Sequence, residues 1–249
     1  MELTNAYRKM VAGLSAARSR RESGLFKAEG TKCVLDTITY FDTEALMATS
    51  AWVQSHPQFK DMATVVTARD LDRMSSLSTA PDVIAVYKIP EVPLDVPALA
   101  NELVVALDSI QDPGNLGTII RSADWFGVRN ILCSKDTVDV YNPKVVQATM
   151  GAIARVKVHY CDLGSVIADL KPVAAYGTFL DGENIYDSQL TSEGIIVMGN
   201  EGKGISAGVA SAVNRRISIP SFPVGEPTSE SLNVAVATSI VLAEFRRRQ

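Results

Sequence analysis

The chain has 249 residues, a formal net charge of −4 and 47% apolar residues, enough to bury one large core or two smaller ones. This acidic balance argues against a protein that coats nucleic acid through bulk charge, so any RNA partner must meet local basic patches. The first residues lack the apolar segment of a signal peptide, and no run approaches the roughly 20 apolar residues of a membrane span. We therefore expect a cytoplasmic protein with no membrane partner.

The cysteines and histidines do not suggest a metal centre. Cys33, Cys133 and Cys161 lie far apart and are odd in number, which disfavours both a metal cluster and a disulfide framework. His56 and His159 have no partner that suggests a metal or a catalytic triad. We expect reduced cysteines and no bound metal.

Basic residues gather near the two ends of the chain. The first group is Arg8, Lys9, Arg18, Arg20, Arg21 and Lys27, and the second is Arg246, Arg247 and Arg248. Groups of this size are common on solvated helix faces, so they fit either an RNA contact or an ordinary surface.

Before residue 89 the chain alternates between helical and extended patterns. Apolar side chains recur at helical spacing over residues 5–21, which predicts a helix. Apolar and β-branched runs at Ala45–Val53, Thr64–Thr67 and Val83–Tyr87 alternate with further helical stretches. These patterns predict a small α/β unit.

A proline-rich linker follows at Ile89–Pro97. Its three prolines in nine residues each lack a backbone donor and fix their own φ angle. We expect it to divide the chain into a domain over residues 1–92 and a second over residues 93–249.

The second domain contains five short apolar runs separated by helical patterns. The predicted strands are Leu103–Leu107, Asn130–Cys133, Ala174–Phe179, Gly194–Met198 and Arg216–Ile219. Regular alternation of strand and helix predicts a parallel sheet that is covered on both faces, with ligands bound at the carboxyl ends of the strands.

The first strand leads into a Pro-Gly turn and a helix. Asn115 lies at the predicted helix start, where its amide could cap free N–H groups. Arg121 follows six residues later, about 240° away around the helix, so the two side chains do not share a helix face. Trp125 and Phe126 follow on the same helix and are expected to pack rather than to stack on bases.

The second loop, Gly199–Ile205, follows strand Gly194–Met198 and contains three glycines that allow a close backbone approach to a ligand. It is not a Walker sequence, because only two residues separate Gly199 from Gly202 and no hydroxyl residue follows Lys203. A dinucleotide fingerprint is also missing after strand Leu103–Leu107. These differences exclude the common phosphate-loop and nicotinamide classes.

The third loop begins at Ile219 and leads into the apolar helix Ala235–Phe245. Pro220 ends the strand before it. Ser229 or Ser231 could cap the helix, and Asn233 has the same capacity. From the residues alone, capping and a functional role are both open.

Together these loops resemble the three signature motifs of the SpoU, or TrmH-like, branch of the SPOUT methyltransferases. The matching segments are DPGNLGTIIRSA at Asp112–Ala123, MGNEGKGIS at Met198–Ser206, and IPSFP with SESLNVAVA within Ile219–Ala237. More loosely, FKAEG at Phe26–Gly30 is similar to the family's substrate-binding domain. The chain differs from the family pattern at Phe222–Glu230, which is a few residues longer.

The resemblance implies a fold and an activity. The fold would be α/β, with a C-terminal parallel sheet that contains a deep trefoil knot and a small N-terminal α/β substrate-binding domain. The activity would be methyl transfer from S-adenosyl-L-methionine to a ribose 2′-hydroxyl of structured RNA, with ribosomal RNA favoured over transfer RNA. Members of the family act as homodimers, so a homodimer is expected.

The resemblance also assigns roles to individual residues. Arg121 would contact the target nucleotide and assist removal of the hydroxyl proton, although a guanidinium is a poor general base at neutral pH. The other polar motif positions would orient the RNA and Arg121: Asn115, Glu201, Ser231 and Asn233. The cofactor contacts would be Thr178, Gly199, Ile219 and Leu232; for Ile219 and Leu232, plain core packing is the alternative.

Two other functions remain open. The chain could be a non-catalytic RNA-binding or assembly protein that retains the fold. It could instead methylate a base nitrogen of RNA. A cofactor-binding measurement together with a test of methyl incorporation distinguishes the non-catalytic protein from a ribose methyltransferase. Mapping the modified atom distinguishes base methylation from ribose methylation.

Overall fold

The fold consists of two compact units. The computed structural model describes residues 3–223, 226 and 229–247. One unit contains residues up to Glu91 together with Asp139–Ala154, and the other contains Val92–Val138 and the chain from Arg155 onward. The chain thus changes unit between Glu91 and Val92, within the proline-rich linker. The first unit, however, also takes in residues 139–154, which the sequence placed in the second domain.

The first unit is built on a mixed sheet with the strand order β1-β4-β2-β3. Its strands are β1 (Leu25–Glu29), β2 (Thr43–Ala48), β3 (Ala63–Val65) and β4 (Val83–Lys88). β4 pairs antiparallel with β1 and β2, whereas β3 pairs parallel with β2 at the edge. Strand β2 ends sooner than the apolar run Ala45–Val53 suggested, because Thr49 accepts a hydrogen bond from the Trp52 amide and caps a helix there.

Helices surround this sheet. They are α1 (Asn5–Gly13), α2 (Ala17–Ser23), α3 (Thr31–Thr37), α4 (Ser50–Ser55), η1 (Pro57–Phe59), α5 (Ala68–Met74), α7 (Pro143–Thr149) and η3 (Ala152–Ala154). The single helix predicted over residues 5–21 is wrong: the extended backbone of Ala16 separates α1 from α2. Helices α1 and α5 cover one core through Val11, Leu71 and Ile84, and α7 packs on β1.

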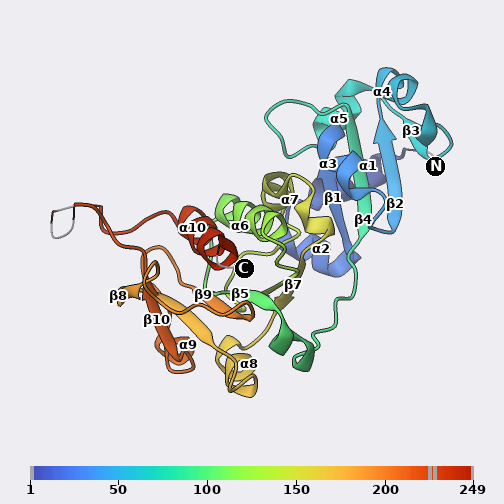
Figure 1. The fold of residues 1–249 in the computed structure, drawn as a ribbon. Helices are drawn as coiled ribbons and strands as arrows, with labels where there is room; N and C mark the ends of the chain where they lie inside the picture. The colour runs from blue at the N-terminus through green and yellow to red at the C-terminus, as the bar shows by residue number, and fades with distance from the viewer. Residues whose placement is uncertain (1–2, 224–225, 227–228, 248–249) are drawn as a thin grey trace. The chain divides into compact units, whose positions relative to one another are not determined.

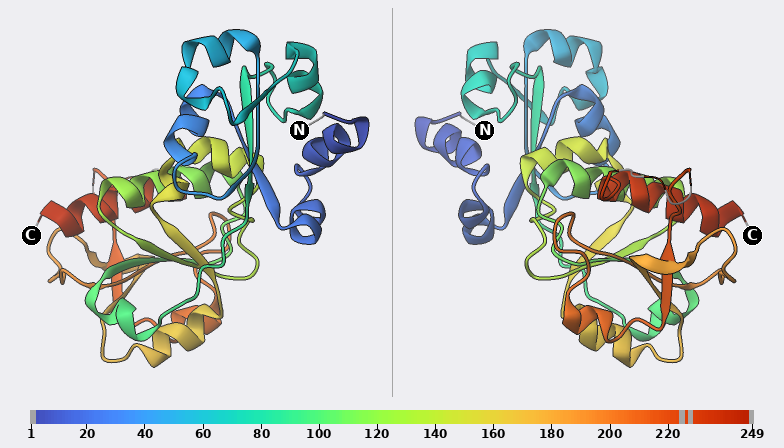
Figure 2. Two further views of the ribbon diagram at one scale, coloured as in Figure 1. Left: turned by 90° about the vertical axis from the view of Figure 1, so that its right-hand side faces the viewer. Right: turned by 90° about the vertical axis from the view of Figure 1, so that its left-hand side faces the viewer.

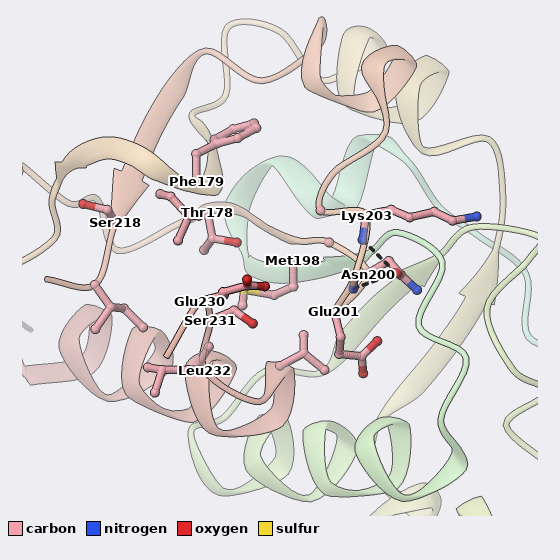
Figure 3. Close-up of a pocket in the computed structure, with 17 residues that line it drawn as sticks. Thr178, Phe179, Met198, Asn200, Glu201, Lys203, Ser218, Glu230, Ser231 and Leu232 are labelled. Carbon is pink, nitrogen blue, oxygen red and sulfur yellow. Dashed lines mark hydrogen bonds between the residues drawn. The ribbon is translucent and has the colours of Figure 1, made fainter. Parts of the chain in front are cut away.

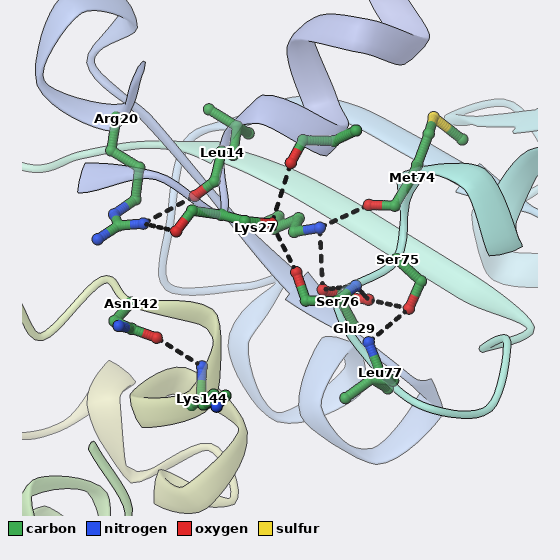
Figure 4. Close-up of polar contacts among 12 residues, drawn as sticks. Leu14, Arg20, Lys27, Glu29, Met74, Ser75, Ser76, Leu77, Asn142 and Lys144 are labelled. Carbon is green, nitrogen blue, oxygen red and sulfur yellow. Dashed lines mark hydrogen bonds and ion pairs between the residues drawn. The ribbon is translucent and has the colours of Figure 1, made fainter. Parts of the chain in front are cut away.

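Two residues of the basic group near the start of the chain are buried and cannot contact RNA (Figure 4). Lys27 is fully buried; its ammonium lies 3.1 Å from the Glu29 carboxylate and donates to the Met74 carbonyl. Arg20 is 1% exposed and pairs with Asp139 at 2.5 Å. Buried charges need such partners to offset desolvation, so these two cations stabilise the unit instead of forming a surface.

The second unit contains a six-stranded sheet with the order β10-β8-β9-β5-β6-β7, in which every pair is parallel. Its strands are β5 (Leu103–Leu107), β6 (Asn130–Cys133), β7 (Lys157–Tyr160), β8 (Ala175–Asn184), β9 (Gly194–Met198) and β10 (Arg215–Ser218). The predicted parallel α/β architecture is confirmed. Strand β7 escaped prediction because it is a short edge strand in which polar and apolar residues are mixed.

Helices cover both faces of this sheet (Figures 1 and 2). Helices α6 (Pro113–Trp125) and α10 (Val234–Arg247) pack on each other and on one face. Helices α8 (Leu163–Asp169) and α9 (Ala207–Ala210) and the short η2 (Pro97–Asn101) cover the other, where Val104, Ile195 and Val166 share a core. Buried faces on both sides explain the continuous apolar runs of the central strands.

The three cysteines are free thiols. Among the described helices, none is both long and apolar enough to cross a membrane. The described residues also contain no group of three or more His, Cys, Asp or Glu side chains that could hold a metal ion.

Candidate functional site

A cavity of about 480 Å³ lies within the second unit, where the middle of β8 and the segments that follow β9 and β10 meet the start of α10 (Figure 3). Parallel strands present their carboxyl ends at one edge, which is where ligands of open α/β sheets bind. Its lining combines apolar side chains, glycine backbone and a few polar groups. The lining residues are Thr178, Phe179, Leu180, Met198, Gly199, Asn200, Glu201, Gly202, Lys203, Gly204, Ser218, Ile219, Glu230, Ser231, Leu232, Val234 and Ala237.

The glycine-rich loop 199–204 forms one wall of the cavity. Asn200 and Gly204 exchange two backbone hydrogen bonds, of 3.0 and 2.8 Å, which closes the loop on itself. A Cβ atom at Gly199 would lie 2.3 Å from the carbonyl carbon of Gly204. Position 199 therefore requires glycine because of this close approach of backbone to backbone.

A chain of side-chain hydrogen bonds joins the three motif loops. The Asn115 Nδ2 donates to the Glu201 Oε1 at 2.6 Å, and the Asn233 Nδ2 donates to the Asn115 Oδ1 at 2.9 Å. These contacts span 86 and 118 residues of sequence. Three of the polar residues that the sequence singled out thus form one connected group, whose member Glu201 lines the cavity.

Helix α10 determines in which direction these side-chain hydrogen bonds run from donor to acceptor. The Asn233 Oδ1 accepts hydrogen bonds from the backbone amides of Ala235 and Val236, at 3.0 and 3.2 Å, and so caps the helix. Its Nδ2 must then point to Asn115, whose own Nδ2 is left to donate to the Glu201 carboxylate. Capping and participation in the site are therefore not alternatives for Asn233, because the two ends of one amide do both.

The capping role expected of Asn115 belongs to another residue. Asp112 is the N-cap of α6, since its carboxylate accepts from the Asn115 backbone amide at 2.8 Å. That leaves the Asn115 side chain free for Glu201 and Asn233. The candidate cap Ser231 instead lines the cavity, and residues 227 and 228 in the longer segment Phe222–Glu230 lie outside the described residues, as do 224 and 225.

The four residues assigned to cofactor contact, Thr178, Gly199, Ile219 and Leu232, all line the cavity. Thr178 follows the buried part of β8, and its hydroxyl donates to the Val197 carbonyl at 3.2 Å. Leu232 is 46% exposed, so core packing does not account for it. Other lining residues, including Phe179 and Asn200, were not predicted from the sequence, although each adjoins a predicted site residue.

Among the predicted site residues, Arg121 alone neither lines the cavity nor belongs to the hydrogen-bonded chain Asn233–Asn115–Glu201. It does not line the cavity, and its exposed side chain makes no hydrogen bond or ion pair with the described part of the chain. It lies on the solvent side of α6, one turn before Trp125, which is 85% exposed. The expectation that Trp125 packs within the fold is therefore wrong.

One side of the cavity is edged by a stacked arginine. The Arg216 guanidinium lies 3.5 Å above the centroid of the Phe179 ring and pairs with Asp181 at 2.6 Å. Gly177 makes room for the ring, because a Cβ there would lie 2.5 Å from it. The packing holds Phe179 as a rigid apolar wall.

A family model, a related sequence and solved structures all assign this chain to the same family. Residues 102–243 match the SpoU rRNA Methylase family. The 23S rRNA (guanosine(2553)-2′-O)-methyltransferase RlmP of Bacillus subtilis is 34% identical over 176 residues, which cover 70% of this chain and 68% of that protein. The solved structure of a TrmH-family protein from Porphyromonas gingivalis covers 100% of both chains, with 35% identity and a TM-score of 0.89.

A second structure, of an AdoMet-bound rRNA methyltransferase from Sinorhizobium meliloti, covers 100% of this chain and 97% of its own, with 27% identity and a TM-score of 0.85. A parallel α/β unit with a cavity at the carboxyl ends of its strands is thus the architecture of an RNA methyltransferase. The chain belongs to the SpoU rRNA methylase family.

Proposed function

We propose that this protein transfers a methyl group from S-adenosyl-L-methionine to a ribose 2′-hydroxyl of 23S ribosomal RNA. The hydrogen-bonded chain Asn233–Asn115–Glu201 beside the cavity carries the proposal, because it joins one polar residue from each of the three motifs. The names of relatives support the target: RlmP of Bacillus subtilis and a protein of Streptomyces viridochromogenes are 23S rRNA ribose 2′-O-methyltransferases.

The cavity fits the proposed cofactor. Its volume of about 480 Å³ lies within the usual range for small-molecule sites. The apolar side chains of Met198, Ile219 and Leu232 suit a nucleoside, and the Gly199 backbone permits close contact. The Glu201 and Glu230 carboxylates suit a positively charged ligand. When bound, the cofactor supplies a methyl group on a positively charged sulfur.

The residues of the chain would align the ribose oxygen and help to remove its proton. Displacement at carbon requires the attacking oxygen to lie in line with the leaving sulfur, so rigid positioning accounts for much of the rate. We assign that positioning to Asn115, Glu201, Ser231 and Asn233. A guanidinium is a poor general base, so we assign to Arg121 the role of holding a phosphate and stabilising the developing negative charge on the oxygen.

We further propose that the protein is a homodimer. Helices α6 and α10, which pack on each other, expose the apolar residues Trp125 to 85% and Val236 to 50%, and apolar side chains exposed on adjoining helices fit a protein–protein contact. A second copy on this face would also enclose Arg121, which lies beside Trp125 and outside the cavity of its own chain. Light scattering tests this: Trp125→Glu should yield monomers, whereas Met62→Glu, at another exposed apolar residue, should not.

Three finer features of the fold belong to the same proposal. The segment between β9 and α10 would thread the trefoil knot of the family, which fits the meeting of loops 199–204 and 218–219 with the start of α10 around one cavity. The domain of residues 1–92, which forms most of the first unit, would bind the RNA, and residues 93–249 would carry the transfer. The protein would work in the cytoplasm, where its RNA is found.

The test is transfer of tritium from labelled S-adenosylmethionine to ribosomal RNA from cells that lack the gene. Wild-type protein should label 23S RNA, Arg121→Ala should not, and Arg129→Ala, which changes an exposed arginine paired with Asp124, should label normally. The labelled position should resist alkaline cleavage, because only ribose methylation blocks the adjacent phosphodiester. Alkali-sensitive label would refute ribose methylation in favour of base methylation, and unlabelled RNA would refute the proposal.

A further inference from the structure

Asn200 lies at the centre of the glycine-rich loop and uses both ends of its side-chain amide. Its Oδ1 accepts hydrogen bonds from the backbone amides of Gly202 and Lys203, at 3.0 and 3.1 Å. Its Nδ2 donates to the Ser109 carbonyl at 2.8 Å. The oxygen therefore shapes the loop that lines the cavity, while the nitrogen ties the loop to the segment between β5 and α6.

Ser109, whose carbonyl accepts the hydrogen bond from Asn200, is itself fixed by further contacts. Ser109 has a φ angle of 60°, which non-glycine residues rarely adopt, and its backbone amide donates to the Ser134 hydroxyl at 2.8 Å. A second tie lies beside it: the buried Asp108 carboxylate accepts from the Ser206 backbone amide at 2.7 Å. The loop is thus attached near both of its ends to the residues that immediately follow β5.

These attachments determine where the next residue can reach. Glu201 follows Asn200 directly, and its carboxylate accepts from Asn115, which lies six residues after Ser109 in the first turn of α6. Two consecutive loop residues thus bind one segment at two points. The hydrogen bond from Asn200 to the Ser109 carbonyl therefore determines how far the Glu201 carboxylate lies from the Asn115 side chain.

We propose that Asn200 is a positioning residue of the methyl transfer, with separable roles for the two ends of its amide. The oxygen shapes the cofactor wall, and the nitrogen sets Glu201 toward Asn115. The inference rests on the proposed function for its rate measurements, whereas its cofactor-binding measurements stand by themselves.

Two variants separate the roles. Asn200→Asp keeps an oxygen for the Gly202 and Lys203 amides but cannot donate to the Ser109 carbonyl. It should bind S-adenosylmethionine within about threefold of wild type and lower kcat by about 10- to 100-fold, because small displacements are costly in a positioned reaction. Asn200→Ala loses both roles and should also weaken cofactor binding by about tenfold.

A matched control exists elsewhere in the same unit. Asn214 accepts from the Ala175 amide at 3.0 Å and donates to the Val173 carbonyl at 3.2 Å, so its side chain also bridges backbone groups, but it does not line the cavity. Asn214→Ala should lower the melting temperature about as much as Asn200→Ala does. It should leave kcat and cofactor binding unchanged.

Calorimetric binding of S-adenosylmethionine, kcat on 23S RNA and thermal unfolding are measured for all four proteins. A low kcat with near-normal binding in Asn200→Asp alone supports the proposal. Wild-type kcat in Asn200→Asp, an equal loss of binding in both Asn200 variants, or an equal loss of kcat in Asn214→Ala overturns it. Wild type that transfers no methyl group refutes the proposed function instead, and normal cofactor binding by Asn200→Ala would then still overturn the loop-shaping role.

Discussion

The Asn233 side chain allows capping and the motif hydrogen-bond chain to be separated by substitution. Its oxygen caps α10 through Ala235 and Val236, a contribution of about 1 kcal/mol. Its nitrogen donates to Asn115, also worth about 1 kcal/mol. Asn233→Ala should therefore lower the free energy of unfolding by about 2 kcal/mol. Asn233→Asp, which keeps the cap and loses the donor, should lower it by about 1 kcal/mol.

The same two variants should have nearly equal effects on methyl transfer, because both break the link to Asn115 and release Glu201 from its fixed orientation. Urea unfolding followed by circular dichroism measures the stabilities, and label transfer to 23S RNA measures the rate. Asn142→Ala is the control: Asn142 caps α7 by accepting from the Lys144 amide at 3.0 Å, so this variant should lose about 1 kcal/mol and keep full activity. Equal stabilities for the two Asn233 variants, or normal transfer by Asn233→Asp, would refute the reasoning.

Three further predictions concern other parts of the chain. Gly199→Ala should abolish detectable cofactor binding in calorimetry, because its methyl group would overlap the Gly204 backbone; binding within threefold of wild type would contradict this. Lys27→Met should lower the free energy of unfolding by about 3–5 kcal/mol, since it leaves the buried Glu29 carboxylate without its cation, and a loss below about 1 kcal/mol in urea unfolding would argue against the pair. Burial lowers the pKa of His159 below its usual 6.5, so as the pH falls the imidazole is protonated in the unfolded chain before it is protonated in the folded one. The contribution of His159 to the free energy of unfolding should therefore be constant above pH 6.5 and decrease as the pH drops below that value. His159→Gln should remove that part of the slope in unfolding experiments at pH 5–8, and an unchanged slope would assign it to other groups.

The strands of the second unit were the most predictable part of the fold. Strands β5, β6 and β9 begin and end where the predicted runs do, because a parallel sheet covered on both faces buries every residue of these strands except Asn130, which is half-buried at the start of β6. Strand β7 has a mixed pattern since it lies at the sheet edge. The pattern of apolar residues in the sequence reflects burial, so it predicts a strand best where nearly all of the strand is buried.

The same limit explains the error over residues 139–154. The pattern of α7 predicts a helix that buries one side, but it cannot say which sheet the helix covers. Only the tertiary structure shows that α7 packs on β1 of the first unit. In the same way, the composition near the start of the chain shows cations, whereas their burial against Glu29 and Asp139 depends on contacts that the sequence does not encode locally.

The sequence by itself determined which loops matter and which residue types they offer. Thr178 lies in β8, Gly199 and Ile219 directly follow strands, and Leu232 precedes a helix. A parallel sheet brings such positions to one edge, so their shared cavity was foreseeable. The tertiary structure decided how the polar side chains are used. Asn115 and Arg121 are six residues apart on one helix, yet Asn115 binds Glu201 while Arg121 faces solvent. The helical repeat turns the two side chains to different sides of α6, and the rest of the same chain packs on only one of those sides.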